Sequence, residues 1–354
     1  MKLDNKKFIP LSAPSIYGNE KKYIFDCIKT KWLSTSGSYV DKFEYKISKY
    51  TKSKFAIACN SGTSALHISL IIAGATPGDE VIVPTLTFVA TINVVRYLNC
   101  NPIFMDSDDS CNIDIKKTIE YIQDKTIFKN NHTINAKTKK RIIAIIVVHV
   151  WGNIIDFLKL KKICKKRNIK IIEDASESLG SFYDTGEFKG KHTGTIGDFG
   201  CISFNGNKII TCGGGGVILT QVKKLADKAK YLTNQAKNDQ TFFIHNEIGY
   251  NYRLTNIQAA VGLGQLEKIN KILKKKKEIH NFYLNHINKI SGLKLLSVSF
   301  GKVNYWMNVI LVDREFKYKK EKLIKIFQNQ KIETRPIWFL NHQQKYLRQF
   351  EKYK

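Results

Sequence analysis

Asp174 stands directly after the apolar run at 169–172, within the sequence Glu173-Asp174-Ala175. A carboxylate at the carboxyl end of a buried parallel strand faces the crevice in which α/β proteins bind their ligands. There it can bind a magnesium ion, a ribose or a protonated heterocyclic nitrogen, or it can cap the following helix. Because a buried acid without a partner is costly, we expect a polar or charged group close to it.

Lys208 lies between another apolar run, at 199–205, and four consecutive glycines at 213–216. Most of the 58 Lys and Arg side chains in the chain must be surface charges, but the sequence IITCGGGG after Lys208 is a poor setting for a solvated side chain. An amine in such a setting can act as a Schiff-base nucleophile, since desolvation and neighbouring cations lower the pKa of lysine.

A third group, Gly62-Thr63-Ser64, follows the apolar run at 54–60 and begins a helical pattern. A glycine, two hydroxyls and the first amides of a helix can form a phosphate cradle, although the same residues also occur in an ordinary capped helix. No Gly-Lys-Ser/Thr follows, so this is not a Walker loop. Phe88, after the apolar run at 80–85, either covers a ligand in this cradle or belongs to the core.

Composition limits the classes of function. The 58 basic and 30 acidic side chains give a net charge of +28, which admits nucleic acid, acidic membranes and phosphorylated metabolites as partners. The lysines are scattered, and no basic stripe with interleaved aromatics is present, so a nucleic-acid binder or regulator remains only an alternative. Seven cysteines without a Cys-x-x-Cys pair indicate reduced thiols in a cytoplasmic protein, and no metal-ligand spacing is present. The apolar run at 142–151 is too short to span a membrane, and the N-terminal sequence lacks a signal-peptide core.

The elements that position these residues follow from the alternation of apolar runs with helical patterns. Short β-branched runs predict strands at 54–60, 80–85, 102–106, 141–150, 169–175 and 199–205. Runs that are apolar on both faces, separated by helices, indicate a mostly parallel sheet covered on both sides, an α/β fold. We expect a large domain at 1–240, with a polar insertion at about 124–140. A smaller α+β domain at 241–354 is expected to contain a long helix at 256–287, a strand at 303–313 and a helix at 319–330.

The chain as a whole resembles the DegT/DnrJ/EryC/StrS family of sugar-nucleotide aminotransferases, which belong to the fold-type-I pyridoxal-phosphate enzymes. The resemblance runs from about Phe8 to His342 and covers nearly the whole chain. The motifs that carry it are NSGTSALH, PGDEVIVPTLTFVAT, VHVWGNIID, EDASESLGSFY, HTGTIGDFGCISFNGNKIITCGGGG and IGYNYRLTNIQAAVGLGQL. It implies a three-layer α/β/α large domain, pyridoxal 5'-phosphate as cofactor and no metal.

The resemblance also implies roles for individual residues. Lys208 would form the Schiff base with the cofactor and then move the proton between cofactor and sugar, and Asp174 would pair with the pyridinium nitrogen. Gly62, Thr63, Ser64 and Ser203 would bind the phosphate, and Phe88 would stack on the ring. Asn251 would reach the phosphate in a neighbouring subunit, which implies a homodimer with shared active sites. Glu177 stands where many relatives carry Gln or His near the ring hydroxyl, so its role stays open.

Within the family, the sequence is most similar to the LegC-like branch of legionaminic acid and bacillosamine pathways. That branch implies transfer of an amino group from glutamate to the C4 ketone of a UDP-linked 4-keto-6-deoxy-N-acetylhexosamine, for surface polysaccharide such as lipopolysaccharide O-antigen. Arg253 and Arg335 are candidates for binding anionic groups, either the carboxylate of the amino donor or the phosphates of the nucleotide, and His342 is a further candidate for substrate binding. A dehydratase of the same fold is the alternative, but such relatives carry His in place of the lysine. HQQKYLRQF at 342–350 lacks a proline common in relatives, and we expect a small domain that is short at its C-terminus.

Overall fold

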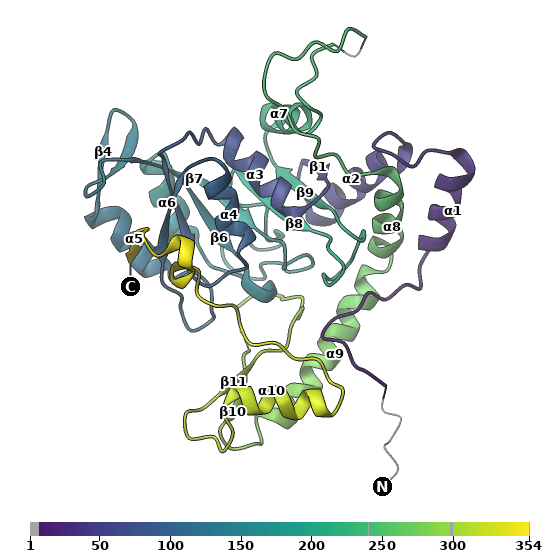
Figure 1. Cartoon of the computed structure of the whole chain (residues 1–354), viewed down its shortest axis with the longest axis vertical. Coiled ribbons are helices and arrows are strands. Elements are labelled where there is room, and N and C mark those ends of the chain that lie inside the picture. The colour runs from purple at the N-terminus through teal and green to yellow at the C-terminus, as the bar shows by residue number, and fades with distance from the viewer. Residues whose placement is uncertain (1–6, 240, 298–299, 354) are drawn as a thin grey trace.

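The computed structural model describes residues 7–239, 241–297 and 300–353. Residue 240, the last of the predicted large domain, lies outside these residues. A central mixed sheet dominates the fold (Figure 1), with the strand order β1-β9-β8-β7-β6-β2-β3-β12. The strands are β1 (Phe55–Cys59), β9 (Gly216–Thr220), β8 (Phe199–Ser203), β7 (Lys170–Asp174), β6 (Arg141–Val148), β2 (Glu80–Pro84), β3 (Asn101–Met105) and β12 (Lys352–Tyr353).

Most neighbours in this sheet run parallel, as the sequence predicts. Only β9 is antiparallel to its neighbours β1 and β8 within this row, so that β1, β8, β7, β6 and β2 all end at the same edge of the sheet. The carboxyl ends of parallel strands are where α/β proteins place their ligands. The α/β fold with a mostly parallel sheet is therefore confirmed.

The core covers both faces of the sheet. Along β6, Ile146 and Val148 pack into one cluster of buried side chains, while Ile145 and Val147 pack into another. Strand β2 shows the same division, with Val81 facing one cluster and Ile82 the other. Since each fully buried side chain of this size contributes about 1.5–3 kcal/mol, these continuous apolar runs account for much of the stability of the sheet.

Helices separate the strands and cover the sheet. In chain order they are α1 (Glu20–Thr30), α2 (Ser38–Thr51), α3 (Gly62–Ile72), α4 (Ala90–Tyr97), α5 (Ile115–Asp124), α6 (Leu158–Lys166) and α7 (Lys223–Thr233). Helix α3 packs against β7, β8 and β9, and α1 and α2 pack against α8 (Asn256–Leu266). The hydroxyl of Ser61 caps α3 by accepting a hydrogen bond from the amide of Ser64. This cap fixes the start of α3 at the carboxyl edge of the sheet.

The polar segment at 124–140 contains a hairpin formed by β4 (Thr126–Lys129) and β5 (His132–Asn135), which pairs with the start of β6. Its two turn residues, Asn130 and Asn131, both have positive φ, the geometry that favours Asn in a two-residue hairpin turn. The side-chain amide of Asn135 donates to Glu80 and Glu351 at 2.8 and 2.6 Å. The hairpin thus ties the last described residues to the start of β2.

Two expectations for the C-terminal region are wrong. The predicted long helix is divided into α8 and α9 (Ile269–Ile287) at Lys268, whose φ of −106° and ψ of 6° depart from helical geometry. The predicted strand at 303–313 shrinks to β11 (Ile310–Val312), which pairs with β10 (Leu293–Leu295). The residues before β11 bond instead to the loop after β7, where Lys302 pairs with Phe182.

Helix α10 (Lys320–Asn329) forms where the sequence predicts it. After α10 the chain returns to the large sheet through two short 3₁₀ helices, Asn341–Gln343 and Lys345–Leu347, and ends as β12 beside β3 (Figure 1). The division into domains at residue 240 remains a prediction. Over the described ranges, no helix is long and apolar enough to cross a membrane.

Candidate active site

A cavity of about 350 Å³ opens at the carboxyl edge of the sheet, where β1, β7 and β8 end. Seven residues singled out from the sequence line it: Gly62, Thr63, Phe88, Asp174, Glu177, Ser203 and Lys208. They come from segments up to 146 residues apart, since 208 − 62 = 146. The fold therefore brings the phosphate cradle, the acid and the lysine to one place.

Asp174 is buried at the end of β7, and both of its carboxylate oxygens accept hydrogen bonds. The hydroxyl of Thr91 donates to Oδ2 at 2.7 Å, and the amide of Ser176 donates to Oδ1 at 3.1 Å. A carboxylate has about four acceptor sites, so these two bonds fix its orientation and leave room for another donor. The side chain can hold a protonated ring nitrogen that enters the cavity.

Lys208 projects into the cavity with 14% of its side chain exposed. Its Nζ lies 3.4 Å from Oε1 of Glu177 and 4.2 Å from the ring centre of Trp306. The amine is thus held between a carboxylate and an aromatic face, shielded from solvent. This is the setting that the glycine-rich sequence after Lys208 led us to expect.

Glu177 is buried against the same lysine. Its Oε2 accepts a hydrogen bond from the amide of Trp151 at 2.8 Å, and Trp151 has an unusual positive φ of 54°. Burial raises the pKa of Glu177 above its ordinary value, although the charge of Lys208 and the Trp151 amide lower it in part. The side chain can accept a hydrogen bond when ionised and donate one when protonated.

The first turn of α3 forms the opposite wall of the cavity. A Cβ on Gly62 would come within 2.8 Å of the Cβ of Ser203 and 3.2 Å of the Oγ of Ser176, so the backbone must approach these serines closely. The first amides of a helix have no partner within the helix and carry its positive dipole end. Together with Thr63, these groups fit a phosphate.

Ser64 has a different place from the other cradle residues. Its hydroxyl donates to Oδ1 of Asn60 at 2.6 Å and lies 2.8 Å from the hydroxyl of Ser61, and the residue is buried outside the lining of the cavity. Here it stabilises the turn that leads into α3, as a cap does.

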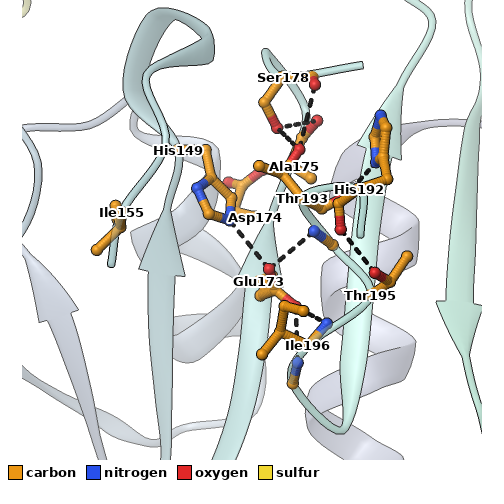
Figure 2. A network of polar contacts seen from close by, with 12 residues as sticks. His149, Ile155, Glu173, Asp174, Ala175, Ser178, His192, Thr193, Thr195 and Ile196 are labelled. Carbon is orange, nitrogen blue, oxygen red and sulfur yellow. Dashed lines mark hydrogen bonds and ion pairs between the residues drawn. The ribbon is translucent and has the colours of Figure 1, made fainter. Parts of the chain in front are cut away.

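A buried network behind Asp174 fixes the loop before β8 (Figure 2). Oε1 of Glu173 accepts from the amides of Ile196 and Gly197, both at 2.6 Å, and Oε2 accepts from the amide of Gly194 at 2.8 Å. Nε2 of His149 lies 3.0 Å from the same oxygen. Burial alone would raise the pKa of Glu173, but the bonds from His149 and the loop amides lower it overall. His149 is itself fully buried within this network.

Four further predicted residues lie outside the lining of the cavity. Asn251 is exposed, and the backbone of Arg253 pairs with that of Cys59 at the end of β1 as an isolated antiparallel β-bridge. Arg335 is exposed and pairs with Glu333 at 2.5 Å, and Nδ1 of His342 lies 2.5 Å from the hydroxyl of Thr85. In this single chain, none of these four residues lines the cavity.

Several cavity residues were missed by the sequence analysis. Trp306 and Trp338 come from the C-terminal third of the chain, Thr91 from α4 and Ser176 from the loop after Asp174. Thr91 lies within the motif PGDEVIVPTLTFVAT and Ser176 within EDASESLGSFY. Both residues could therefore have been found from the motifs that carry the family resemblance. Trp338 ends the sequence ETRPIW at 333–338, which resembles a substrate-side segment of the LegC-like branch, whereas nothing in the sequence around Trp306 indicated that it would return to the site.

The family model of the DegT/DnrJ/EryC1/StrS aminotransferases matches residues 14–354 of this chain. The chain belongs to that family. It is 38% identical over 336 residues to a GDP-perosamine synthase of Escherichia coli O157:H7, with 95% of this chain and 86% of the relative covered. It is 32% identical over 295 residues to the UDP-4-amino-4,6-dideoxy-N-acetyl-beta-L-altrosamine transaminase of Campylobacter jejuni, with 82% and 73% covered.

Among solved structures, this DegT/DnrJ/EryC1/StrS aminotransferase is similar to Helicobacter pylori PseC, described as an aminotransferase involved in pseudoaminic acid biosynthesis. The TM-score is 0.84 at 25% identity, with 97% of this chain and 88% of that chain covered. The enzyme is a pyridoxal-phosphate-dependent aminotransferase, as the family resemblance implied. Its cavity fits the cofactor, because an amine, a fixed carboxylate and an anion-binding helix terminus converge there.

Proposed function

We propose that this enzyme transfers an amino group from glutamate to the C4 ketone of a nucleotide-linked 4-keto-6-deoxy sugar in the synthesis of a surface polysaccharide. The observation that carries the proposal is the convergence of Lys208, Asp174 and the start of α3 on one cavity. When bound, pyridoxal phosphate supplies an electron sink that lets a nitrogen and a proton move between two carbon skeletons.

Each of the converging groups has a distinct task in this proposal. Lys208 binds the cofactor covalently through Nζ and, once released, carries a proton at that atom. Asp174, held by Thr91 and Ser176, keeps the ring nitrogen protonated by pairing with it. The hydroxyls of Thr63 and Ser203 bind the phosphate with the first amides of α3, as does the hydroxyl of Ser176, while Ser64 supports their turn.

Phe88 and Glu177 complete the proposed cofactor site. The ring of Phe88 is 56% exposed and lies at the cavity, where it can stack on a planar ligand and lose that exposure. Glu177 approaches Lys208 from the other side and orients its amine. Dehydration, the alternative reaction of this fold, is disfavoured because relatives that remove a hydroxyl carry His where this chain has Lys208.

The substrate-binding residues are proposed to act in a homodimer. An exposed arm between α7 and Asn251 projects from the body of the molecule (Figure 1) and carries the exposed side chains Phe242, Phe243, Ile244 and Ile248. Such a group of apolar side chains on a projecting segment favours burial against another chain. In the dimer, Asn251 would reach the partner's cofactor phosphate, while Arg253, Arg335 and His342 would meet anionic groups of the substrate.

The sugar nucleotide has two candidates. The sequence favours a UDP-linked 4-keto-6-deoxy-N-acetylhexosamine, and the relative from Campylobacter jejuni supports a UDP-linked sugar. Relatives named GDP-perosamine synthase are 38%, 35% and 34% identical to this chain, which supports a GDP-linked sugar instead. Assaying amine formation on both ketones at matched concentrations decides between them, and the UDP proposal is rejected when only the GDP-linked ketone reacts.

The first experiment is an absorbance spectrum of the purified protein with pyridoxal phosphate, before and after glutamate is added. We expect a visible band that glutamate removes and that Lys208→Ala lacks. Absence of the band in the wild-type protein would contradict the aminotransferase. A band that glutamate leaves unchanged would contradict glutamate as donor.

The seven cysteines all carry free thiols, which supports the reducing cytoplasm that we propose as its location. A regulator that binds nucleic acid through its charge would instead bind generic DNA with an affinity that falls steeply with salt, independent of the cofactor.

A further inference from the structure

Trp306 contacts the reactive lysine from a part of the chain almost a hundred residues away. Its indole is 4% exposed, and the Nζ of Lys208 lies over its face at 4.2 Å from the ring centre. A lysine ammonium over a tryptophan face is attracted by the ring quadrupole, and the attraction grows when solvent is excluded. The Oε1 of Glu177 also lies close to this ammonium, 3.4 Å from Nζ.

The ring of Trp306 is fixed at both ends. Its Nε1–H donates to the backbone carbonyl of Asn207 at 2.7 Å, next to Lys208 itself. Its backbone amide donates to Oδ1 of Asn304 at 3.0 Å. The indole therefore cannot turn away from the lysine without breaking the bond from Nε1, and the bond from the backbone amide fixes the main chain at this residue.

Asn304 connects this arrangement to Glu177. It is buried, and its side-chain amide donates to the backbone carbonyls of Glu177 and Leu179 at 2.8 and 3.0 Å. Asn304 therefore bonds to the backbone of both residues that lie beside the ammonium, Trp306 and Glu177.

We infer that the indole of Trp306, together with Glu177, forms the resting place of the Lys208 amine in the part of the reaction when the lysine is detached from the cofactor. The inference rests on the proposed function and deepens it. Trp306 is a positioning residue, since it acts by holding Lys208 inside the cavity, ready to exchange a proton, instead of leaving a flexible four-carbon side chain to reach solvent.

The direct test observes the indole groups by NMR in the pyridoxamine-phosphate form of the full-length enzyme, in which Lys208 is free. The chain has four tryptophans, and Trp306→Phe identifies the resonance of interest. We expect Lys208→Met to shift the Trp306 resonance and to leave that of the exposed Trp32 in place. Lys275→Met, which removes an exposed charge from α9, is the matched control and should shift neither. An unchanged Trp306 resonance in Lys208→Met overturns the inference.

A kinetic test follows each half-reaction separately in single turnovers. Trp306→Leu should slow both half-reactions by between about 2- and 30-fold, the range expected for a cation–π contact, and Trp306→Phe should restore part of the rate. The Lys208-dependent visible band and the melting temperature report whether each variant is folded and loaded. If the wild-type protein lacks the band, the proposed function fails. If the band is present and Trp306→Leu reacts at the wild-type rate, only this inference fails.

Discussion

Gly152 and Asn304 lie so close together that a Cβ on Gly152 would overlap Oδ1 of Asn304. The glycine follows Trp151, whose amide holds Glu177, and the asparagine holds the backbone of Glu177 from the other side. This contact joins the loop after β6 to a segment that precedes β11. A side chain at 152 would separate the two supports of the active-site carboxylate.

Gly152→Ala is therefore expected to be strongly destabilising. Its φ of 90° alone costs a residue with a Cβ about 1–2 kcal/mol, and the overlap with Asn304 adds to this. Gly74→Ala is the matched control, because Gly74 has the same φ of 90° and no atom within 4 Å of its added Cβ. Chemical denaturation of both variants measures the difference. Equal losses in the two would show that the close approach to Asn304 has no energetic weight.

Thr91→Val should weaken cofactor binding without disturbing the fold. Valine has the shape of threonine but cannot donate to Asp174, and a hydrogen bond to a charged group contributes about 1.5–3 kcal/mol. The dissociation constant for pyridoxal phosphate should rise by about 10- to 100-fold, as measured by titrating the visible band. Thr91→Ser keeps the hydroxyl and should bind nearly as the wild type does. Identical dissociation constants for the Val and Ser variants would show that the hydroxyl of Thr91 does not contribute to cofactor binding.

Glu173→Gln should lower the free energy of unfolding by about 3 kcal/mol or more. The carboxylate receives three loop amides and faces His149, whereas an amide side chain would direct its own N–H groups at some of these donors. Glu187→Gln, an exposed acid in the neighbouring loop, serves as the control and should change little. A denaturation midpoint of Glu173→Gln equal to that of Glu187→Gln would contradict the role assigned to the network.

Because His192 is buried, we expect the free energy of unfolding to decrease at acidic pH. Burial lowers its pKa to about 4, and its Nε2 accepts a hydrogen bond from the amide of Gly180 at 2.8 Å, which requires the neutral ring. Below pH 6.5, the ordinary pKa of the side chain, the unfolded chain takes up a proton that the folded chain excludes. Stability is thus fully present above pH 6.5 and falls by about 3 kcal/mol as the pH approaches 4. His192→Gln should remove this part of the slope, and an unchanged slope in the variant would show that His192 is accessible to protons.

The part of the site that lies at strand ends was predictable from the sequence. Lys208, Asp174 and Gly62 each follow an apolar run, and parallel strands bring the ends of such runs together at one edge. The resemblance to a family supplied the cofactor, which the residues alone left open.

The remaining features depend on contacts that leave no periodic pattern. Trp306 reaches the site because Asn304 bonds to the backbone carbonyls of Glu177 and Leu179. Every residue has such a carbonyl, so the sequence does not show which residues accept these hydrogen bonds. The break before α9 leaves no pattern either, since it lies at a single residue, Lys268, whose backbone departs from helical geometry. A continuous helical pattern at 256–287 is compatible with both one helix and two.

The return of the chain to the large sheet as β12 limits how the region around α10 and β11 can move. This region is attached to the large sheet through α8 and α9, through Lys302, Asn304 and Trp306, and through Asn341, whose side chain bonds to the backbone of Thr85 and Thr87. A body attached by a single linker can swing in any direction, but one attached at several separated points cannot turn freely about any of them. A cut in one of these connections would therefore leave the region tied to the sheet by the others.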